Sequence, residues 1–243
     1  PTVVANLKDI IEEVREGDFD VGIAFDGDVD RIGVINNEGE IVWADYLLVV
    51  FARDILKKRK GKVLFDVKCS QVLEEQIKRS GGEPVMWKTG HSLIKEKMKE
   101  VKAILGGEMS GHIFFSDDYY GYDDAIYVAC RLVKLLSDTG KKLTQLTSDI
   151  PKFFSTPEIR AECPSDEEKF KIAARAKNYF TANYDCITVD GVRIKFGDGW
   201  GLVRASNTQP VIVLRFEAST AERLQQIKEI VTSKLRQFGE IKV

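Results

Sequence analysis

The sequence lacks the features of disulfide-rich, membrane-spanning and nucleic-acid-binding proteins. Its four cysteines, at positions 69, 130, 163 and 186, form no C-x-x-C pair, which indicates reduced thiols used as small core residues. No stretch reaches the roughly 18 apolar residues of a membrane span, and the N-terminus lacks a signal-peptide pattern. Lys and Arg (36) nearly balance Asp and Glu (38) and are scattered. We therefore expect a soluble cytoplasmic protein with no nucleic-acid partner and no membrane partner.

The composition that remains is that of a globular chain. Hydrophobic residues make up 44% and charged residues 30% of 243 positions, a length that suits two compact units plus a remnant. Residues 2–16 have the apolar spacing of an amphipathic helix, and the sequence enters this helix at once. The chain thus reads as if it began partway through a domain.

The order of apolar segments predicts an α/β fold in three parts. A helix at 2–16, a strand at 21–25 that we expect to be covered on both faces, and a hairpin form a block, 1–40, which we interpret as the tail of a second domain. Helices then alternate with short apolar strands, which predicts a Rossmann-like α/β domain over 41–152. Prolines 151, 157 and 164 mark a linker, and 153–243 is expected to be a small α+β domain.

The acidic stretch D-G-D-V-D-R is the first candidate site. Asp26, Asp28 and Asp30 occupy alternate positions after an apolar run, so in an extended segment their carboxylates point to one side. Unpaired, they would repel one another, and a hard divalent cation such as Mg²⁺ removes that conflict. Arg31 could then hold an anion that also touches the metal.

Three other interpretations of this loop compete with a magnesium site. An EF-hand is excluded, because Arg31 and Asn37 stand where that loop needs Gly and Glu. A haloacid-dehalogenase-type phosphatase also places D-x-D after an apolar strand, although its D-x-D-G-T/V continuation is missing here. The third interpretation is a solvated acidic turn, which the flanking apolar strands disfavour.

Two glycine-flanked loops after predicted strands are further candidates. In L-G-G-E-M-S-G-H, Glu108, Ser110 and His112 alternate and could contact sugar hydroxyls, or could be a loop-closing Glu and a packed His. In K-T-G-H, His91 stands where a strand meets a helix and could contact an anion, act in acid–base chemistry or pack there. Lys68 ends another strand and could contact the same substrate.

The turn R-A-S-N-T-Q-P is the fourth candidate. Arg204, Ser206, Asn207 and Thr208 supply a guanidinium, two hydroxyls and an amide within five residues, a donor set suited to a phosphate dianion. A polar hairpin turn is the alternative, since Asn and Ser favour turns. The Arg at the strand end favours phosphate binding.

Together these motifs resemble the α-D-phosphohexomutases, especially the bacterial phosphomannomutase/phosphoglucomutase branch. D-G-D-V-D-R, K-T-G-H, G-E-M-S-G-H and R-A-S-N-T-x-P occur in that order over nearly the whole chain. The resemblance implies a four-domain Mg²⁺ enzyme that interconverts hexose 1-phosphate and 6-phosphate. A phosphoserine donates its phosphoryl group to the sugar phosphate, and a hexose 1,6-bisphosphate intermediate reorients before returning the other phosphoryl.

The resemblance implies roles for individual residues. Asp26, Asp28 and Asp30 match the metal ligands, and Arg31 and His112 match catalytic positions near the reacting centre. The resemblance also implies substrate contacts. Lys68, Thr89, Gly90 and His91 would line the cleft, and Glu108 and Ser110 would contact sugar hydroxyls. The non-reacting phosphate would be held by Arg204, Ser206, Asn207 and Thr208.

One expected motif of this family is missing. The T-A-S-H-N-P-type loop with the nucleophilic serine does not occur in these 243 residues. We therefore expect a C-terminal portion that is inactive alone and whose missing N-terminal domains are its partners. A non-catalytic sugar-phosphate-binding module and a metal-dependent phosphatase with Asp26 as nucleophile are the alternatives. Mannose and glucose both stay open, because Glu108 and Ser110 would contact hydroxyls common to both, and glucosamine is not excluded.

Overall fold

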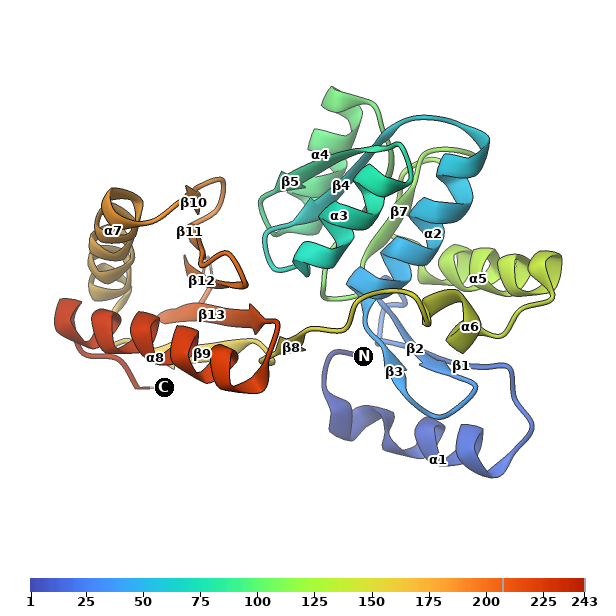
Figure 1. The fold of residues 1–243 in the computed structure, drawn as a ribbon, viewed down its shortest axis with the longest axis horizontal. Helices are drawn as coiled ribbons and strands as arrows, with labels where there is room; N and C mark the ends of the chain where they lie inside the picture. The colour runs from blue at the N-terminus through green and yellow to red at the C-terminus, as the bar shows by residue number, and fades with distance from the viewer. Residues whose placement is uncertain (207, 243) are drawn as a thin grey trace. The chain divides into compact units, whose positions relative to one another are not determined.

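The computed structural model describes residues 1–206 and 208–242. Asn207, part of the expected phosphate-binding turn, lies outside the described residues. The chain folds into two compact units, Pro1–Pro151 and Lys152–Val243. Most elements of both units are labelled in Figure 1.

Unit 1 begins with a small antiparallel sheet and a helix. A 3₁₀ helix (Val4–Leu7) leads into α1 (Lys8–Glu16), followed by β1 (Val21–Phe25), β2 (Ile32–Asn36) and β3 (Ile41–Val42) in the order β1-β2-β3. The predicted hairpin is confirmed. The expectation that β1 is covered on both faces is wrong: Phe25 is 41% exposed. As an edge strand of an antiparallel sheet, β1 packs one face on α1 and leaves the other open.

A parallel sheet forms the rest of unit 1. Strands β4 (Lys62–Asp66), β5 (Glu83–Trp87) and β6 (Ala103–Gly107) are parallel in the order β5-β4-β6. The short strand β7 (Ile113–Phe115), which the sequence did not predict, pairs antiparallel with β6 at the edge. The helices are α2 (Ala44–Lys58), α3 (Gln71–Arg79), α4 (His91–Val101), α5 (Ala125–Thr139) and α6 (Leu143–Thr147).

Helices pack on both faces of this sheet, which explains the continuous apolar runs of its strands (Figure 1). Leu64 of β4 belongs to a cluster with Ile94 and Met98 of α4. On the opposite face, Phe115 packs edge-on against Phe51 of α2 with ring centroids 5.0 Å apart. The predicted α/β class is therefore confirmed.

Unit 2 is the expected α+β domain. Its antiparallel sheet contains β8 (Phe154–Ser155), β9 (Ile159–Glu162), β10 (Cys186–Ile187), β11 (Val192–Lys195), β12 (Gly199–Ala205) and β13 (Val211–Ala218), with β13 paired to β12, β8 and β9. Alternate residues of β13 pack against helices α7 (Asp166–Asn183) and α8 (Ala221–Phe238) in one apolar core.

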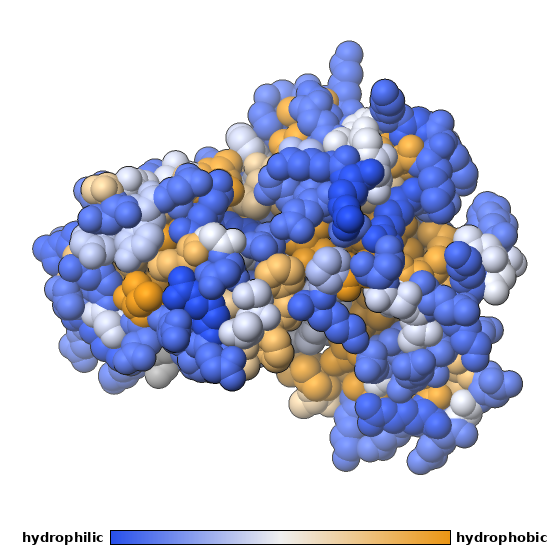
Figure 2. All heavy atoms as spheres, in the orientation of Figure 1, coloured by the Kyte–Doolittle hydropathy of each residue, from blue (hydrophilic) through white to orange (hydrophobic). Residues whose placement is uncertain are grey.

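Polar and charged residues cover much of the face drawn in Figure 2. Within residues 1–206 and 208–242, no helix is long and apolar enough to cross a membrane. The four cysteines are all among the described residues and all free. Cys69 and Cys163 are buried as expected, whereas Cys130 is exposed on α5, so the interpretation as core residues holds only in part.

Candidate active site

The acidic loop between β1 and β2 brings three carboxylates together. One oxygen each of Asp26, Asp28 and Asp30 lies within 4.8 Å of the others. The backbone amides of Asp30 and Arg31 donate to Oδ1 of Asp26 at 3.2 and 3.1 Å, and Nε of Arg31 donates to its Oδ2. The loop is thus closed by its own first aspartate and by the arginine that follows the last one.

A left-handed residue allows this closure. Val29 has a φ of 62°, which is rare for a β-branched side chain. Its backbone is held on both sides, because its amide donates to the carbonyl of Asp26 at 3.3 Å and its carbonyl accepts from the amide of Ala125 at 3.2 Å. The unfavourable conformation is therefore maintained by hydrogen bonds inside and outside the loop.

The electrostatics of the loop fit a hard cation. Burial and the negative charges of Asp26 and Asp28 raise the pKa of Asp30, although His112 opposes the shift. Burial would raise the pKa of Asp26, but hydrogen bonds from Arg31 lower it overall. The buried Oδ1 of Asp30 has no hydrogen-bond partner among the residues that the structure describes. A divalent cation would satisfy this oxygen and remove the repulsion, so the donor set suits Mg²⁺.

The other motifs of unit 1 meet at the carboxyl ends of the parallel strands. Asp66, the last residue of β4, accepts from Oγ1 of Thr89 at 3.0 Å and from the amide of Met109 at 3.3 Å. The side chain of Lys68 is almost fully buried, and its ammonium group lies 3.9 Å from Oδ2 of Asp66. Neighbouring parallel strands end at one edge of the sheet, which is why loops far apart in sequence converge here.

Glu108 lies inside this cluster. It is 2% exposed, and its carboxylate accepts from the amide of Gly90 and from the hydroxyl of Ser110, the latter at 3.4 Å. Burial and the nearby charge of Asp66 raise the pKa of Glu108 to about 7, against the opposing effects of Gly90 and Lys68. In this structure Glu108 closes the loop, which is one of the two roles that the sequence left open.

The G-E-M-S-G-H loop is joined to the acidic loop by backbone. The amide of Ile32 donates to the carbonyl of Gly111 at 3.1 Å. Gly111 has a φ of 106°, and a Cβ there would lie 2.7 Å from the carbonyl oxygen of Ile32. This close approach requires glycine. It brings Nδ1 of His112 to 3.7 Å from Oδ2 of Asp30.

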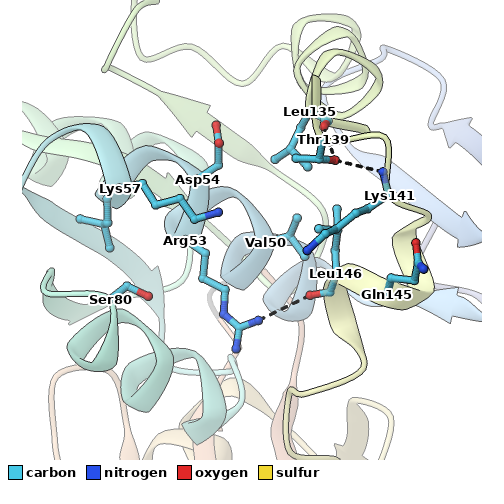
Figure 3. Close-up of a pocket in the computed structure, with 11 residues that line it drawn as sticks. Val50, Arg53, Asp54, Lys57, Ser80, Leu135, Thr139, Lys141, Gln145 and Leu146 are labelled. Carbon is cyan, nitrogen blue, oxygen red and sulfur yellow. Dashed lines mark hydrogen bonds between the residues drawn. The ribbon is translucent and has the colours of Figure 1, made fainter. Parts of the chain in front are cut away.

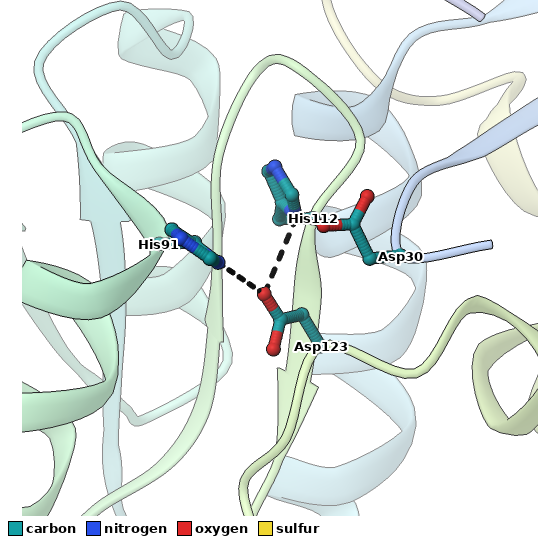
Figure 4. A group of neighbouring side chains, drawn as sticks. All are labelled: Asp30, His91, His112 and Asp123. Atoms are coloured by element: carbon teal, nitrogen blue, oxygen red, sulfur yellow. Dashed lines mark hydrogen bonds and ion pairs between the residues drawn. The ribbon is translucent and has the colours of Figure 1, made fainter. Parts of the chain in front are cut away.

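Asp123 is a site residue that the sequence patterns did not reveal. Its Oδ2 lies 2.6 Å from Nδ1 of His91 and 3.6 Å from Nδ1 of His112 (Figure 4). Its Oδ1 accepts from Lys95 at 2.8 Å. Burial would raise its pKa, but the hydrogen bonds from Lys95 and His91 lower it overall. The pair of aspartates before helix α5 was the available signal, although it is typical of a helix N-terminus, a role that Asp124 fills.

The R-A-S-N-T-Q-P turn lies in unit 2 between β12 and β13. Arg204 is buried, and its Nε donates to Oδ2 of Asp190 at 2.6 Å. Oγ of Ser206 accepts from the amides of Thr208 and Gln209, both at 3.3 Å. Ser206, Thr208 and Gln209 therefore make the side-chain-to-amide hydrogen bonds of a polar turn, the alternative interpretation, and a buried guanidinium precedes them.

A buried lysine that the sequence did not single out supports this turn. Lys169 of α7 is 2% exposed, and its ammonium group donates to the carbonyl of Gln209 at 2.9 Å and to Asp166 at 2.6 Å. Arg160 donates to the side chain of Gln209 at 2.7 Å. These contacts fix the turn and place a second cationic group behind it.

Comparison with known proteins identifies the family. The model for the phosphoglucomutase/phosphomannomutase alpha/beta/alpha domain III matches residues 43–154, and that for the C-terminal domain matches residues 158–234. A phosphomannomutase/phosphoglucomutase from Pseudomonas putida is 49% identical over 232 residues, which are 95% of this chain and 50% of the relative. The chain belongs to the phosphoglucomutase/phosphomannomutase family. It spans about half the length of the curated relatives it matches.

Solved structures of related proteins share this fold. A phosphoglucomutase/phosphomannomutase family protein from Burkholderia thailandensis has a TM-score of 0.90 at 36% identity, covering 100% of this chain and 53% of its own. The fold is also shared with Aspergillus fumigatus N-acetylphosphoglucosamine mutase, solved with GlcNAc-6P and magnesium, at a TM-score of 0.67 and 16% identity over 90% of this chain and 49% of that one.

A cavity elsewhere in unit 1 contains none of the motif residues of this family. It has a volume of about 340 Å³ and is lined by side chains of α2, α5 and α6, including Arg53, Lys57 and Leu146 (Figure 3). The guanidinium of Arg53 is engaged by the carboxylate of Asp149 at 2.7 and 3.0 Å and by Gln76 at 2.7 Å. The charge of this arginine is therefore neutralised within the structure, and the motif cluster remains the candidate active site.

Proposed function

We propose that this chain is the metal-binding, sugar-binding and phosphate-binding part of a phosphohexomutase that interconverts hexose 1-phosphate and 6-phosphate, with mannose or glucose as the sugar, through a phosphoserine and a hexose 1,6-bisphosphate. The principal support is the junction of the two loops of unit 1, where the amide of Ile32 donates to Gly111 and the acidic loop meets the G-E-M-S-G-H loop. Family membership supports the reaction class.

Residues 1–40 are proposed to be the tail of a second domain, with a third domain over 41–152 and a fourth over 153–243. The start of the domain III family model at residue 43 supports the first of these boundaries. The nucleophilic serine is proposed to come from N-terminal domains that this sequence does not include.

Magnesium is proposed to bind Asp26, Asp28 and Asp30. When bound, the ion supplies positive charge that stabilises the charge developing on the transferred phosphoryl group. Arg31 lies beside the carboxylates of Asp26 and Asp30 and is proposed to contact the same phosphoryl group. Magnesium and GlcNAc-6P in the Aspergillus mutase are consistent with this proposal.

The remaining motif residues are proposed to orient the sugar and to move a proton. Ser110 and Glu108 are proposed to contact sugar hydroxyls, for which Glu108 exchanges its hydrogen bond from Ser110 for one from the sugar. Lys68 and the Thr89–Gly90–His91 turn line the same edge of the sheet. His112 is proposed as the proton carrier at the reacting hydroxyl. Burial lowers the pKa of His112, although Asp30 and Asp123 oppose the shift, so a neutral imidazole is available as a base near pH 7.

The turn in unit 2 is proposed to hold the phosphate that does not react. Arg204, Ser206, Asn207 and Thr208 provide the donors, and the buried ammonium group of Lys169 adds positive charge behind the turn. Since phosphoryl transfer depends mainly on positioning and charge neutralisation, a grip on the second phosphate raises the fraction of substrate held in a reactive pose.

Replacing Arg204 with alanine tests phosphate binding. Calorimetry with glucose 1-phosphate should show binding to the wild-type chain and an affinity at least about tenfold lower for Arg204→Ala, the usual order of effect for a charge-assisted contact. Arg175→Ala, on the exposed side of α7, is the matched control and should bind as the wild type does. Equal affinities of wild type and Arg204→Ala would contradict the proposed role of the turn.

The isolated chain is expected to be inactive. A coupled assay with glucose 1-phosphate or mannose 1-phosphate should detect no mutase activity until N-terminal domains carrying the serine loop are added. Phosphate release is also not expected, because hydrogen bonds to both oxygens of Asp26 make this carboxylate a poor nucleophile. Mutase activity from this polypeptide alone, or phosphate release that is lost in Asp26→Asn, would contradict these expectations.

A further inference from the structure

Two histidines and two aspartates gather beside the acidic loop. Asp30 comes from that loop, His91 from the start of α4, His112 from the segment before β7 and Asp123 from the residues before α5 (Figure 4). One ligand atom of each lies within 4.8 Å of the others. The chain has only these two histidines.

Three of the distances among these atoms are close to those of a tetrahedral metal site. Four ligands held about 2.0–2.1 Å from a zinc ion at tetrahedral angles lie about 3.3 Å from one another. Nδ1 of His112 is 3.6 Å from Oδ2 of Asp123 and 3.7 Å from Oδ2 of Asp30. Nδ1 of His91 is 2.6 Å from Oδ2 of Asp123, so this pair has to separate by less than an ångström.

A buried nitrogen in the cluster lacks a partner. Nδ1 of His112 is shielded from solvent and has no hydrogen bond to any residue in the described part of the chain. The buried Oδ1 of Asp30 is in the same state. Lys95 donates to Oδ1 of Asp123 at 2.8 Å, and Nε of Arg31 lies 3.7 Å from Oδ1 of Asp30, beyond hydrogen-bond distance. Oδ2 of each carboxylate is the oxygen nearest to His112.

We propose that Asp30, His91, His112 and Asp123 form a binding site for one zinc-type divalent transition-metal cation. Two imidazoles and two carboxylates select such a cation over Mg²⁺, which prefers oxygen ligands. The site shares Asp30 with the proposed magnesium site and His112 with the proposed proton carrier, so a bound zinc-type cation weakens magnesium binding and blocks proton transfer. Only the metal is needed to occupy it, and the proposal does not depend on the proposed reaction.

Cobalt and zinc titrations of the complete chain test the site. Co²⁺ should bind with the intense visible absorption of four-coordinate cobalt, and one equivalent of Zn²⁺ should remove that absorption. His91→Asn and Asp123→Asn should each weaken Zn²⁺ binding at least about tenfold, since loss of a ligand costs no less than loss of its supporting contact. Circular dichroism checks that both variants are folded, and the half-exposed position of His91 makes His91→Asn the safer of the two.

Two matched variants separate this site from its neighbours. Asp28→Asn removes a ligand of the proposed magnesium site only, and Cys130→Ser removes the exposed thiol. Both should retain the zinc affinity and the cobalt spectrum of the wild type. The proposal is overturned if zinc binds equally well to His91→Asn, if Asp28→Asn or Cys130→Ser abolishes binding, or if cobalt shows only the weak absorption of six-coordinate ions.

Discussion

The free energy of unfolding of unit 1 is expected to fall by about 3 kcal/mol as the pH rises from about 4.5 to above 7, and Glu108→Gln is expected to abolish this decrease. The folded protein holds a proton on this carboxyl up to a pKa of about 7, because the side chain is buried next to Asp66. In the unfolded chain the proton leaves near the ordinary value of 4.5.

The direction of the effect follows from proton binding. Between pH 4.5 and 7 the folded state binds more protons than the unfolded state, so the free energy of unfolding decreases as the pH rises. Below this window both states are protonated, and above it both are ionised and the full cost of the buried charge is present. Glutamine keeps the size of the side chain and an oxygen that can accept from Gly90, but it does not ionise.

Urea unfolding gives the free energy of unfolding of wild type and Glu108→Gln at pH 5 and pH 8, and hydrogen exchange at the amides of β6 follows unit 1. The quantity compared is the difference in stability between the two proteins at each pH. A difference is needed because the lowered pKa of His112 makes stability rise with pH in part of the same range. Glu96→Gln is the control, since it removes an exposed carboxyl of α4 and leaves Glu108 and its hydrogen bonds intact. If the stability of Glu108→Gln changes with pH as much as that of the wild type, Glu108 is not protonated in the folded protein.

Gly111→Ala is expected to destabilise unit 1 by about 2–3 kcal/mol and to separate the two loops of the site. A Cβ at this position would lie 2.7 Å from the carbonyl oxygen of Ile32, and the φ of 106° is unfavourable for any L side chain. The obstacle is backbone, so a rotamer change cannot relieve it. The hydrogen bond from the amide of Ile32 to the carbonyl of Gly111 is then lost.

Gly27→Ala is the matched control for this variant. Gly27 lies in the acidic loop, yet a Cβ there meets no atom within 4 Å among the described residues, and the change should be neutral to within about 0.5 kcal/mol. Urea unfolding measures both variants, and calorimetry with Mg²⁺ reports on the acidic loop. Equal stability of the two variants would mean that the contact between Gly111 and Ile32 does not hold the site together.

The sequence alone predicted most of the elements and named the candidate residues. The alternation of helices with short apolar strands such as K-V-L-F-D-V predicted the parallel sheet, whereas the continuous run at 21–25 wrongly predicted a strand covered on both faces. The four motifs, in order, indicated the family, because each combines turn-forming glycines with side chains of defined chemistry. The antiparallel strand β7 was not predicted, because three residues are too short to show a period.

Only the tertiary structure decided which of these residues meet. Asp123 lies 32 residues from His91, and nothing in their local spacing relates them until β7 and the loop before α5 bring them to one place. The burial of Glu108, and hence its raised pKa, depends on Asp66 and on loops from three strands. Side-chain type and local period are properties of neighbouring residues in the sequence, whereas distances, burial and pKa shifts arise from packing between distant segments. The sequence therefore determined the fold class and the chemistry available, and the packing decided which carboxylates repel one another and which side chains surround each histidine.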